Sequence, residues 1–132
     1  MKDGLKEGVT AEIVHVTTPA DGVTHLGPGA PAVFSTPAMI ALMERTAIKV
    51  VEPYLEETEQ TVGVKVNVDH LAGTKIGITV HARATLTGIE GRRLRFAVEA
   101  HNDDKKIGEG IHERMLIDKR RFVAKAGGEV RS

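Results

Sequence analysis

Cysteine and tryptophan are both absent from this chain of 132 residues, and aromatic residues make up only 3% of it. Without cysteine the chain forms no disulfide, ligates no metal through thiolates and uses no thiol nucleophile. A cysteine-free chain also suits a reducing compartment, so we expect a cytoplasmic protein. The scarcity of aromatic side chains removes the stacking surfaces on which single-stranded nucleic acids are bound.

An excess of charge of either sign is also absent, because 18 Lys and Arg residues balance 18 Asp and Glu residues. A neutral chain has no field that attracts nucleic acid or an anionic membrane. No apolar run approaches the roughly 20 residues needed to span a bilayer, and the charged start MKDGLKEG does not resemble a secretory signal. We therefore expect a soluble protein that binds neither nucleic acid nor membrane. It should fold as a single domain over residues 1–132, with a flexible tail at 123–132.

Residues 35–55, STPAMIALMERTAIKVVEPYL, have the pattern of one long helix. Ser35 and Thr36 are both good N-cap residues, and Pro37 suits the first helical position. Apolar residues then recur at helical spacing, and Pro53 is expected to distort or end the last turn.

The other patterned segments alternate apolar and polar residues and are predicted to be strands. One precedes the helix and four follow it, joined by short connections that favour antiparallel pairing between consecutive strands. The predicted strands cover residues 9–17, 62–72, 76–89, 92–102 and 106–118.

This order of elements predicts an α+β domain in which one long central helix packs across a five-stranded, or six-stranded, antiparallel sheet. The long sheet edges need protection, which a second copy would provide in a homodimer, or in a dimer of dimers. A sheet wrapped around a single helix is the outline of the hotdog fold, and other α+β domains share the same order of elements.

Glu44 interrupts the apolar face of the predicted helix, where its neighbours one turn away are Ile40, Ala47 and Ile48. Because an unpaired buried carboxylate is costly, this side chain needs a partner or a proton. One interpretation is an acid at the edge of the apolar stripe that extends to water or pairs with Arg45 or with a lysine of a strand. The other is a desolvated carboxylate that acts as a nucleophile or general base.

Thr36 and His70 each allow a structural and a functional interpretation. Thr36 needs no further role if it caps the helix, but a hydroxyl at a helix start also lies near free N–H groups that bind a carbonyl oxygen or an oxyanion. His70 ends a predicted strand, where a histidine is usually a surface or structural residue. The histidines lack the spacing of a zinc motif, and no phosphate-binding loop is present, so we expect no metal site.

Several segments, in the same order along nearly the whole chain, resemble the fluoroacetyl-CoA thioesterase branch of the hotdog acyl-CoA thioesterases. The resemblance implies a hotdog homodimer that hydrolyses an acyl-CoA thioester to the free acid and coenzyme A, with no cofactor beyond the coenzyme A of the substrate. The segments are MKDGLKEG, LMERTAIKVVEPYLE, EGRRLRF, IGEGIHER and KRRFVAK.

The same resemblance implies the site residues. The family uses a threonine, a glutamate eight residues later and a histidine 26 residues after that, and Thr36, Glu44 and His70 reproduce both intervals. In these roles Glu44 attacks the thioester carbonyl or activates water, Thr36 orients Glu44 or the carbonyl, and His70 assists proton transfer. Gly63 matches a glycine that the family keeps near the bound acyl group.

The fluoroacetate-specific members carry an insert with aromatic residues before the helix, which acts as a lid. Here the segment HLGPGAPAVFSTP is shorter and keeps only Phe34 as an expected contact to the substrate. The resemblance therefore implies a short or medium acyl group rather than a fluorinated one. A non-catalytic hotdog dimer that binds acyl-CoA or another small ligand is the main alternative. A hydratase with an Asp–His pair, of which Asp69 and His70 are an echo, is a further one.

Distance along the helix is the difficulty for this assignment, since eight helical residues span about 12 Å. Thr36 and Glu44 therefore do not meet on a straight helix. Either Thr36 belongs to a loop that folds back over the first turn, an option that Pro37 favours, or the site combines residues of two protomers. The acyl chain, the choice between coenzyme A and an acyl carrier protein, and the choice between direct attack and activated water stay open.

Overall fold

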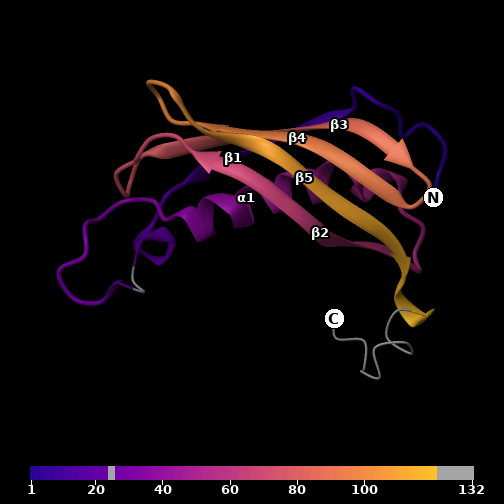
Figure 1. The fold of residues 1–132 in the computed structure, drawn as a ribbon, viewed down its shortest axis with the longest axis horizontal. Coiled ribbons are helices and arrows are strands. Elements are labelled where there is room, and N and C mark those ends of the chain that lie inside the picture. Colours follow the sequence, from indigo (N-terminus) through magenta and orange to yellow (C-terminus); the bar gives the residue numbers. More distant parts are fainter. Residues whose placement is uncertain (24–25, 122–132) are drawn as a thin grey trace.

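The computed structural model describes residues 1–23 and 26–121, and the predicted flexible tail at 123–132 lies outside this part of the chain. One helix packs across a five-stranded antiparallel sheet, which confirms the predicted α+β arrangement with five strands in the described residues (Figure 1). The elements are β1 (Thr10–Val16), α1 (Thr36–Val51), β2 (Glu59–His70), β3 (Thr79–Glu90), β4 (Arg93–His101) and β5 (Lys106–Asp118).

The helix α1 begins one residue earlier than the proline suggests. Ser35 is the N-cap, and its Oγ accepts a hydrogen bond from the N–H of Ala38 at 3.1 Å. Thr36 is the first helical residue, so the loop option for Thr36 is wrong. Pro37 is tolerated at the second helical position because its missing N–H has no intrahelical acceptor there. A 3₁₀ turn, η3 (Glu52–Tyr54), follows α1 directly.

The hydrophobic core lies between α1 and the sheet, where alternate residues of β3 and β4 are buried against one face of the helix. Each large apolar side chain buried in this way contributes roughly 1.5–3 kcal/mol, so the helix is held firmly on the strands. Among the described residues, no helix is long and apolar enough to cross a bilayer. The core side chains include Met39, Leu42, Met43, Val51, Leu86, Leu94, Phe96 and Ile107.

The order of the strands across the sheet is β1-β3-β4-β5-β2, which corrects one prediction. Sequence order predicted that β2 and β3 would pair, but β2 pairs with β5, while β3 pairs with β1 and β4. The connection at residues 71–78 carries the chain across the sheet instead. Eight extended residues reach about 26 Å, and three interstrand spacings measure only about 14 Å. The predicted pairs β3–β4 and β4–β5 are confirmed.

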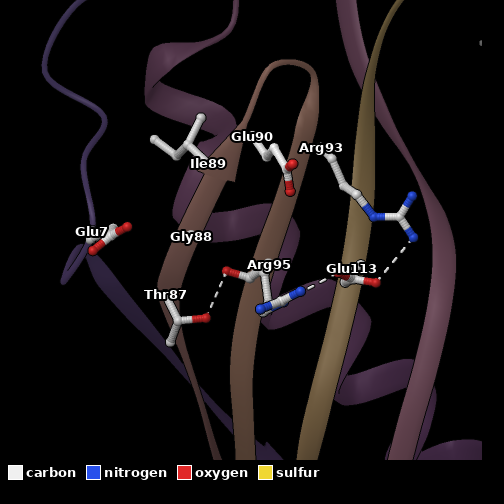
Figure 2. A pocket seen from close by; sticks show the side chains of 8 residues that line it. All are labelled: Glu7, Thr87, Gly88, Ile89, Glu90, Arg93, Arg95 and Glu113. Atoms are coloured by element: carbon white, nitrogen blue, oxygen red, sulfur yellow. Dashed lines mark hydrogen bonds and ion pairs between the residues drawn. The ribbon is translucent and has the colours of Figure 1, made fainter.

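The face of the sheet opposite α1 carries a cluster of charged side chains. Glu113 of β5 accepts hydrogen bonds there from Arg93 at 3.1 Å and from Arg95 at 3.2 Å, and these groups line an open cleft (Figure 2). The hydrogen bond from Arg93 is the main reason that the pKa of Glu113 is lowered, although the burial of Glu113 opposes the shift. None of the predicted site residues lines this cleft, and Thr36 and Glu44 belong to α1, so the candidate site is on the helix side.

Candidate active site

Thr36 and His70 meet at the start of the helix. The Oγ1 of Thr36, in the first turn of α1, lies 2.8 Å from the Nδ1 of His70, the last residue of β2. Burial lowers the pKa of His70, and an interaction with the backbone of Ala72 opposes part of this shift. The Nε2 of His70 is buried and has no hydrogen-bond partner in the described part of the chain. The neutral imidazole thus has one nitrogen engaged by a hydroxyl and the other available to a ligand.

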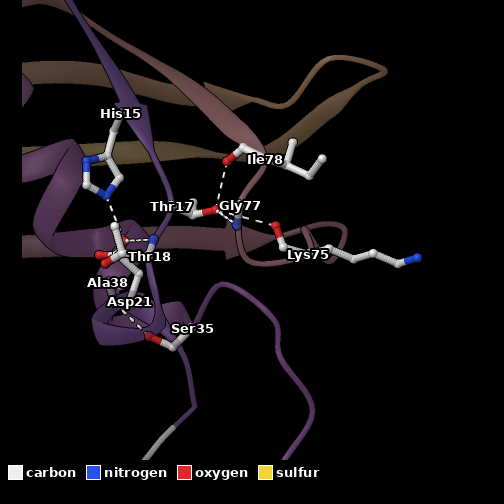
Figure 3. A network of polar contacts seen from close by, with 9 residues as sticks. All are labelled: His15, Thr17, Thr18, Asp21, Ser35, Ala38, Lys75, Gly77 and Ile78. Atoms are coloured by element: carbon white, nitrogen blue, oxygen red, sulfur yellow. Dashed lines mark hydrogen bonds and ion pairs between the residues drawn. The ribbon is translucent and has the colours of Figure 1, made fainter.

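A polar network fixes the start of α1 (Figure 3). The Nε2 of His15 lies 2.8 Å from the Oδ2 of Asp21, which also accepts a hydrogen bond from the N–H of Thr18 at 2.7 Å. Burial alone would raise the pKa of Asp21, but these two contacts outweigh it and lower the pKa. The carbonyl oxygen of Asp21 accepts a hydrogen bond from the N–H of Ser35 at 2.8 Å. This turn therefore holds the residue that precedes Thr36.

The connection that follows His70 is fixed by the buried Thr17. Its hydroxyl donates to the carbonyl oxygen of Ile78 at 2.7 Å and accepts a hydrogen bond from the N–H of Gly77 at 2.8 Å (Figure 3). The φ of Gly77 is 99°, which favours glycine at this turn. Both ends of the connection between β2 and β3 are thus held, one by the Thr36–His70 contact and the other by Thr17.

Glu44 lies two turns further along α1, against the strand pair β2–β5. Its Oε2 is 3.7 Å from the Nη1 of Arg114, and its side chain is 39% exposed, whereas that of Arg114 is 6% exposed. A Cβ atom placed on Gly63 would lie 3.3 Å from the same carboxylate oxygen, so the missing side chain of Gly63 leaves room beside Glu44. The partner of Glu44 in the described residues is therefore an arginine of β5 rather than Arg45 or a lysine.

Arg114 is held by two other residues. Its Nε donates to the Oγ1 of Thr61 at 2.8 Å, and its Nη2 donates to the carbonyl oxygen of Thr61 at 3.0 Å. Its Nη1 lies 3.1 Å from the Nε2 of His112, a fully buried residue whose Nδ1 lies 2.8 Å from the carbonyl oxygen of Lys65. Burial lowers the pKa values of both Arg114 and His112.

The FlK family, described as fluoroacetyl-CoA-specific thioesterases, has a sequence profile that matches residues 16–120. The fluoroacetyl-CoA thioesterase of Streptantibioticus cattleyicolor is 40% identical over 131 residues, which cover 95% of this chain and 94% of that protein. The chain belongs to this thioesterase family. It is therefore an acyl-CoA thioesterase, as its sequence predicts.

Solved structures agree with the family assignment. A variant of the fluoroacetyl-CoA thioesterase FlK in complex with acetyl-CoA is 36% identical, has a TM-score of 0.86, and matches over 93% of this chain and 97% of its own. A hot-dog-like protein of Thermanaerovibrio acidaminovorans has a TM-score of 0.86 at 23% identity, over 93% of this chain and 91% of its own. These likenesses confirm the hotdog fold.

In this family member, the structure brings the predicted residues together in two groups rather than one. Thr36 and His70 form the first, and Glu44 and Gly63 form the second, two turns away on the same helix. No hydrogen bond or ion pair joins the two groups within residues 1–23 and 26–121. Phe34 is buried in the core with only 2% of its surface exposed, and its role in substrate binding stays a prediction.

Arg114 and His112 are the residues that sequence reasoning missed. Both lie within the segment IGEGIHER, which contributed to the family resemblance without being assigned a site role. Alternation along β5 places them on the side of the sheet that faces α1, whereas Ile111 and Glu113, which alternate with them, face outward. Two basic residues on the core side of a strand were the signal that could have found them, because such residues need a buried partner.

Proposed function

We propose that this chain hydrolyses a short- or medium-chain acyl-CoA thioester, with Thr36, Glu44 and His70 as its catalytic residues. The observation that carries the proposal is the 2.8 Å contact between the hydroxyl of Thr36 and the imidazole of His70. These residues are 34 positions apart and belong to different elements, so only the fold brings them together. The imidazole also keeps a buried nitrogen without a partner in the described residues, beside which a substrate can lie.

The reaction divides naturally among the three side chains. The carboxylate of Glu44 attacks the thioester carbonyl carbon or removes a proton from the water that attacks it. The hydroxyl and the backbone N–H of Thr36, at the positive end of the helix dipole, stabilise the negative charge that develops on the carbonyl oxygen. The C–S bond then breaks, and coenzyme A leaves as the thiol after proton transfer assisted by His70. Water supplies the hydroxyl group of the product acid.

We propose further that the working unit is a homodimer, alone or within a dimer of dimers, and that each site combines residues of two protomers. Thr36 and Glu44 are separated by about 12 Å along one helix, too far to act on one carbonyl. The strand β2 is at the edge of the sheet and exposes Val64 and Val66, which are 45% and 42% exposed. Antiparallel pairing of two β2 strands would cover this edge.

The same pairing would also complete the site. In an antiparallel pair, the end of one β2, which carries His70, approaches the beginning of the other β2. Thr61, near that beginning, contacts Arg114, which faces Glu44. The Thr36–His70 group of one protomer would thus approach the Glu44 group of its partner.

We infer an acyl group other than fluoroacetyl as the preferred substrate. Phe34 is the only Phe, Tyr or Trp between residues 18 and 35, and its ring packs in the core. An open cleft in this segment is instead lined by small and aliphatic residues. The proposed chemistry uses a carboxylate, a hydroxyl and an imidazole and includes no metal or further cofactor. The cysteine-free composition fits the predicted cytoplasmic location.

Release of free thiol from a panel of thioesters tests the proposal. The panel runs from acetyl-CoA to palmitoyl-CoA and includes fluoroacetyl-CoA and one thioester of an acyl carrier protein. We expect turnover of a short or medium acyl-CoA that disappears in Glu44→Gln. An unchanged rate in Glu44→Gln would contradict the mechanism. Tight binding without any turnover would instead favour the non-catalytic ligand-binding dimer.

A further inference from the structure

We propose that Arg114 is a positioning residue for Glu44, held in a single orientation by Thr61 and by the neutral form of His112. The inference rests on the proposed function, because it assigns to Arg114 the task of orienting the reactive carboxylate. Three features carry it: the anchoring of each nitrogen of the guanidinium, the tautomer of His112, and the space beside Gly63.

Every nitrogen of the Arg114 guanidinium has a partner. Thr61 accepts hydrogen bonds from Nε through its hydroxyl and from Nη2 through its carbonyl oxygen, and His112 lies at hydrogen-bond distance from Nη1. Because a guanidinium is planar, three anchored nitrogens leave it no freedom to rotate. Nη1 carries two hydrogens, and only one of them is donated to His112. The other is left for Glu44, whose Oε2 lies 3.7 Å from Nη1.

The neighbours of His112 determine its protonation. A carbonyl oxygen only accepts hydrogen bonds, so the Nδ1 of His112, at 2.8 Å from the carbonyl oxygen of Lys65, carries the proton. An arginine only donates, so the Nε2 must present its lone pair to Arg114. Both contacts require the same neutral tautomer. His112 also stacks on Phe96, with ring centroids 6.3 Å apart, which fixes the plane of the imidazole.

The contact between Arg114 and Glu44 orients the carboxylate without clamping it. At 3.7 Å the two atoms are too far apart for a direct hydrogen bond, and the partly exposed Glu44 keeps its oxygens available for the thioester. A Cβ atom on Gly63 would lie 3.3 Å from Glu44 and 3.4 Å from Arg114, so glycine keeps this space open. The fixed cation, together with the space that Gly63 leaves beside both side chains, directs the carboxylate toward the substrate.

Substitutions at Thr61 separate positioning from packing. Thr61→Val keeps the shape of the side chain but removes the acceptor for Nε, while Thr61→Ser keeps the hydroxyl. We expect kcat to fall on the order of tenfold in Thr61→Val, the equivalent of one hydrogen bond to a charged group, with KM unchanged. Thr61→Ser should retain most of the wild-type kcat. Equal kcat values in the two variants would overturn the inference, and a rise in KM alone would make Arg114 a substrate-binding residue instead.

Substitutions at His112 repeat the test from the other side of the guanidinium. His112→Gln keeps an acceptor near the position of Nε2, whereas His112→Phe keeps the stacking on Phe96 and removes the acceptor. The rate should be largely retained in the first variant and lost in the second. Glu113→Gln is the matched control, because Glu113 lies on the same strand but faces away from α1. It should reduce stability and leave kcat unchanged.

A nuclear magnetic resonance measurement tests the inference independently of activity. We expect the Nε–H of Arg114 to exchange slowly with solvent in the wild type and rapidly in Thr61→Val, and the nitrogen shifts of His112 to show a proton on Nδ1 alone. A freely exchanging Nε–H in the wild type would overturn the positioning role even in an active enzyme. An inactive wild type with a slowly exchanging Nε–H would instead refute the proposed function on which the role rests.

Discussion

Replacing Gly63 by alanine separates stability from activity at the candidate site. The added Cβ would lie 3.3 Å from the Oε2 of Glu44 and 3.4 Å from both Arg114 and His112, so its neighbours must move by a few tenths of an ångström. The carboxylate can move because it ends a partly exposed, flexible side chain. The variant should therefore fold, but with Glu44 displaced from the position that it holds in the wild type.

Two effects on the stability of Gly63→Ala oppose each other. The smaller conformational freedom of unfolded alanine stabilises a protein by about 0.4–1 kcal/mol, and the tight contacts remove a similar amount. We expect a net change of less than about 1 kcal/mol, which for a domain of this size is a shift of no more than about 4 °C in Tm. Because a misplacement of 1 Å can lower a rate by about a hundredfold, a displacement of a few tenths should lower kcat/KM by roughly fivefold.

Both quantities can be measured on one preparation. Circular dichroism during heating gives Tm, and thiol release from the best acyl-CoA substrate gives kcat/KM. An unchanged kcat/KM in Gly63→Ala would refute the placement of the acyl group beside Glu44 and Gly63. A loss of more than about 10 °C in Tm would instead show that the site is packed too tightly for the space that the structure assigns to it.

Three further predictions concern the packing of α1 on β5, the titration of two histidines and the dimer formed through the edge strand β2. Gly108→Ala should lower the free energy of unfolding by about 1–3 kcal/mol in urea titrations, because its Cβ would overlap the side chain of Met39; full stability would contradict the packing of α1 on β5. Stability should fall as the pH drops below about 6.5, because the lowered pKa values of His70 and His112 let the unfolded chain bind more protons. Urea midpoints at neutral and mildly acidic pH check this, and His112→Gln should flatten the change. Sedimentation should give about twice the chain mass of 14.2 kDa, and a monomer at micromolar concentration would contradict the composite site.

The helix and the strands could be predicted from the sequence because their signals are local. Ser35, the prolines and the apolar spacing define α1, and alternation defines every strand end to within three residues. The pairing of β2 with β5 could not be predicted in this way, because the length of a connection permits pairing between consecutive strands without requiring it. The crossover at residues 71–78 follows from the order of all five strands in the sheet, which the sequence of the connection does not determine.

The candidate site also has a part that could be predicted from the sequence and a part that could not. Family intervals indicated Thr36, Glu44 and His70, and the structure adds the contact between the first and the last of them. The partner of Glu44 could not be found from neighbours in sequence, because Arg114 reaches it only through the register of β5 and the position of α1. Such pairings depend on tertiary structure, which a local pattern does not encode.

Mixing two inactive variants tests the central claim most directly. In a composite site, a dimer that pairs Glu44→Gln with His70→Gln contains one site with both substitutions and one with neither. After unfolding and refolding an equal mixture, we predict recovery of about a quarter of the wild-type rate, because half of the dimers are mixed and each holds one intact site. No recovery, in a mixture shown to contain mixed dimers, would contradict a site that is shared between protomers.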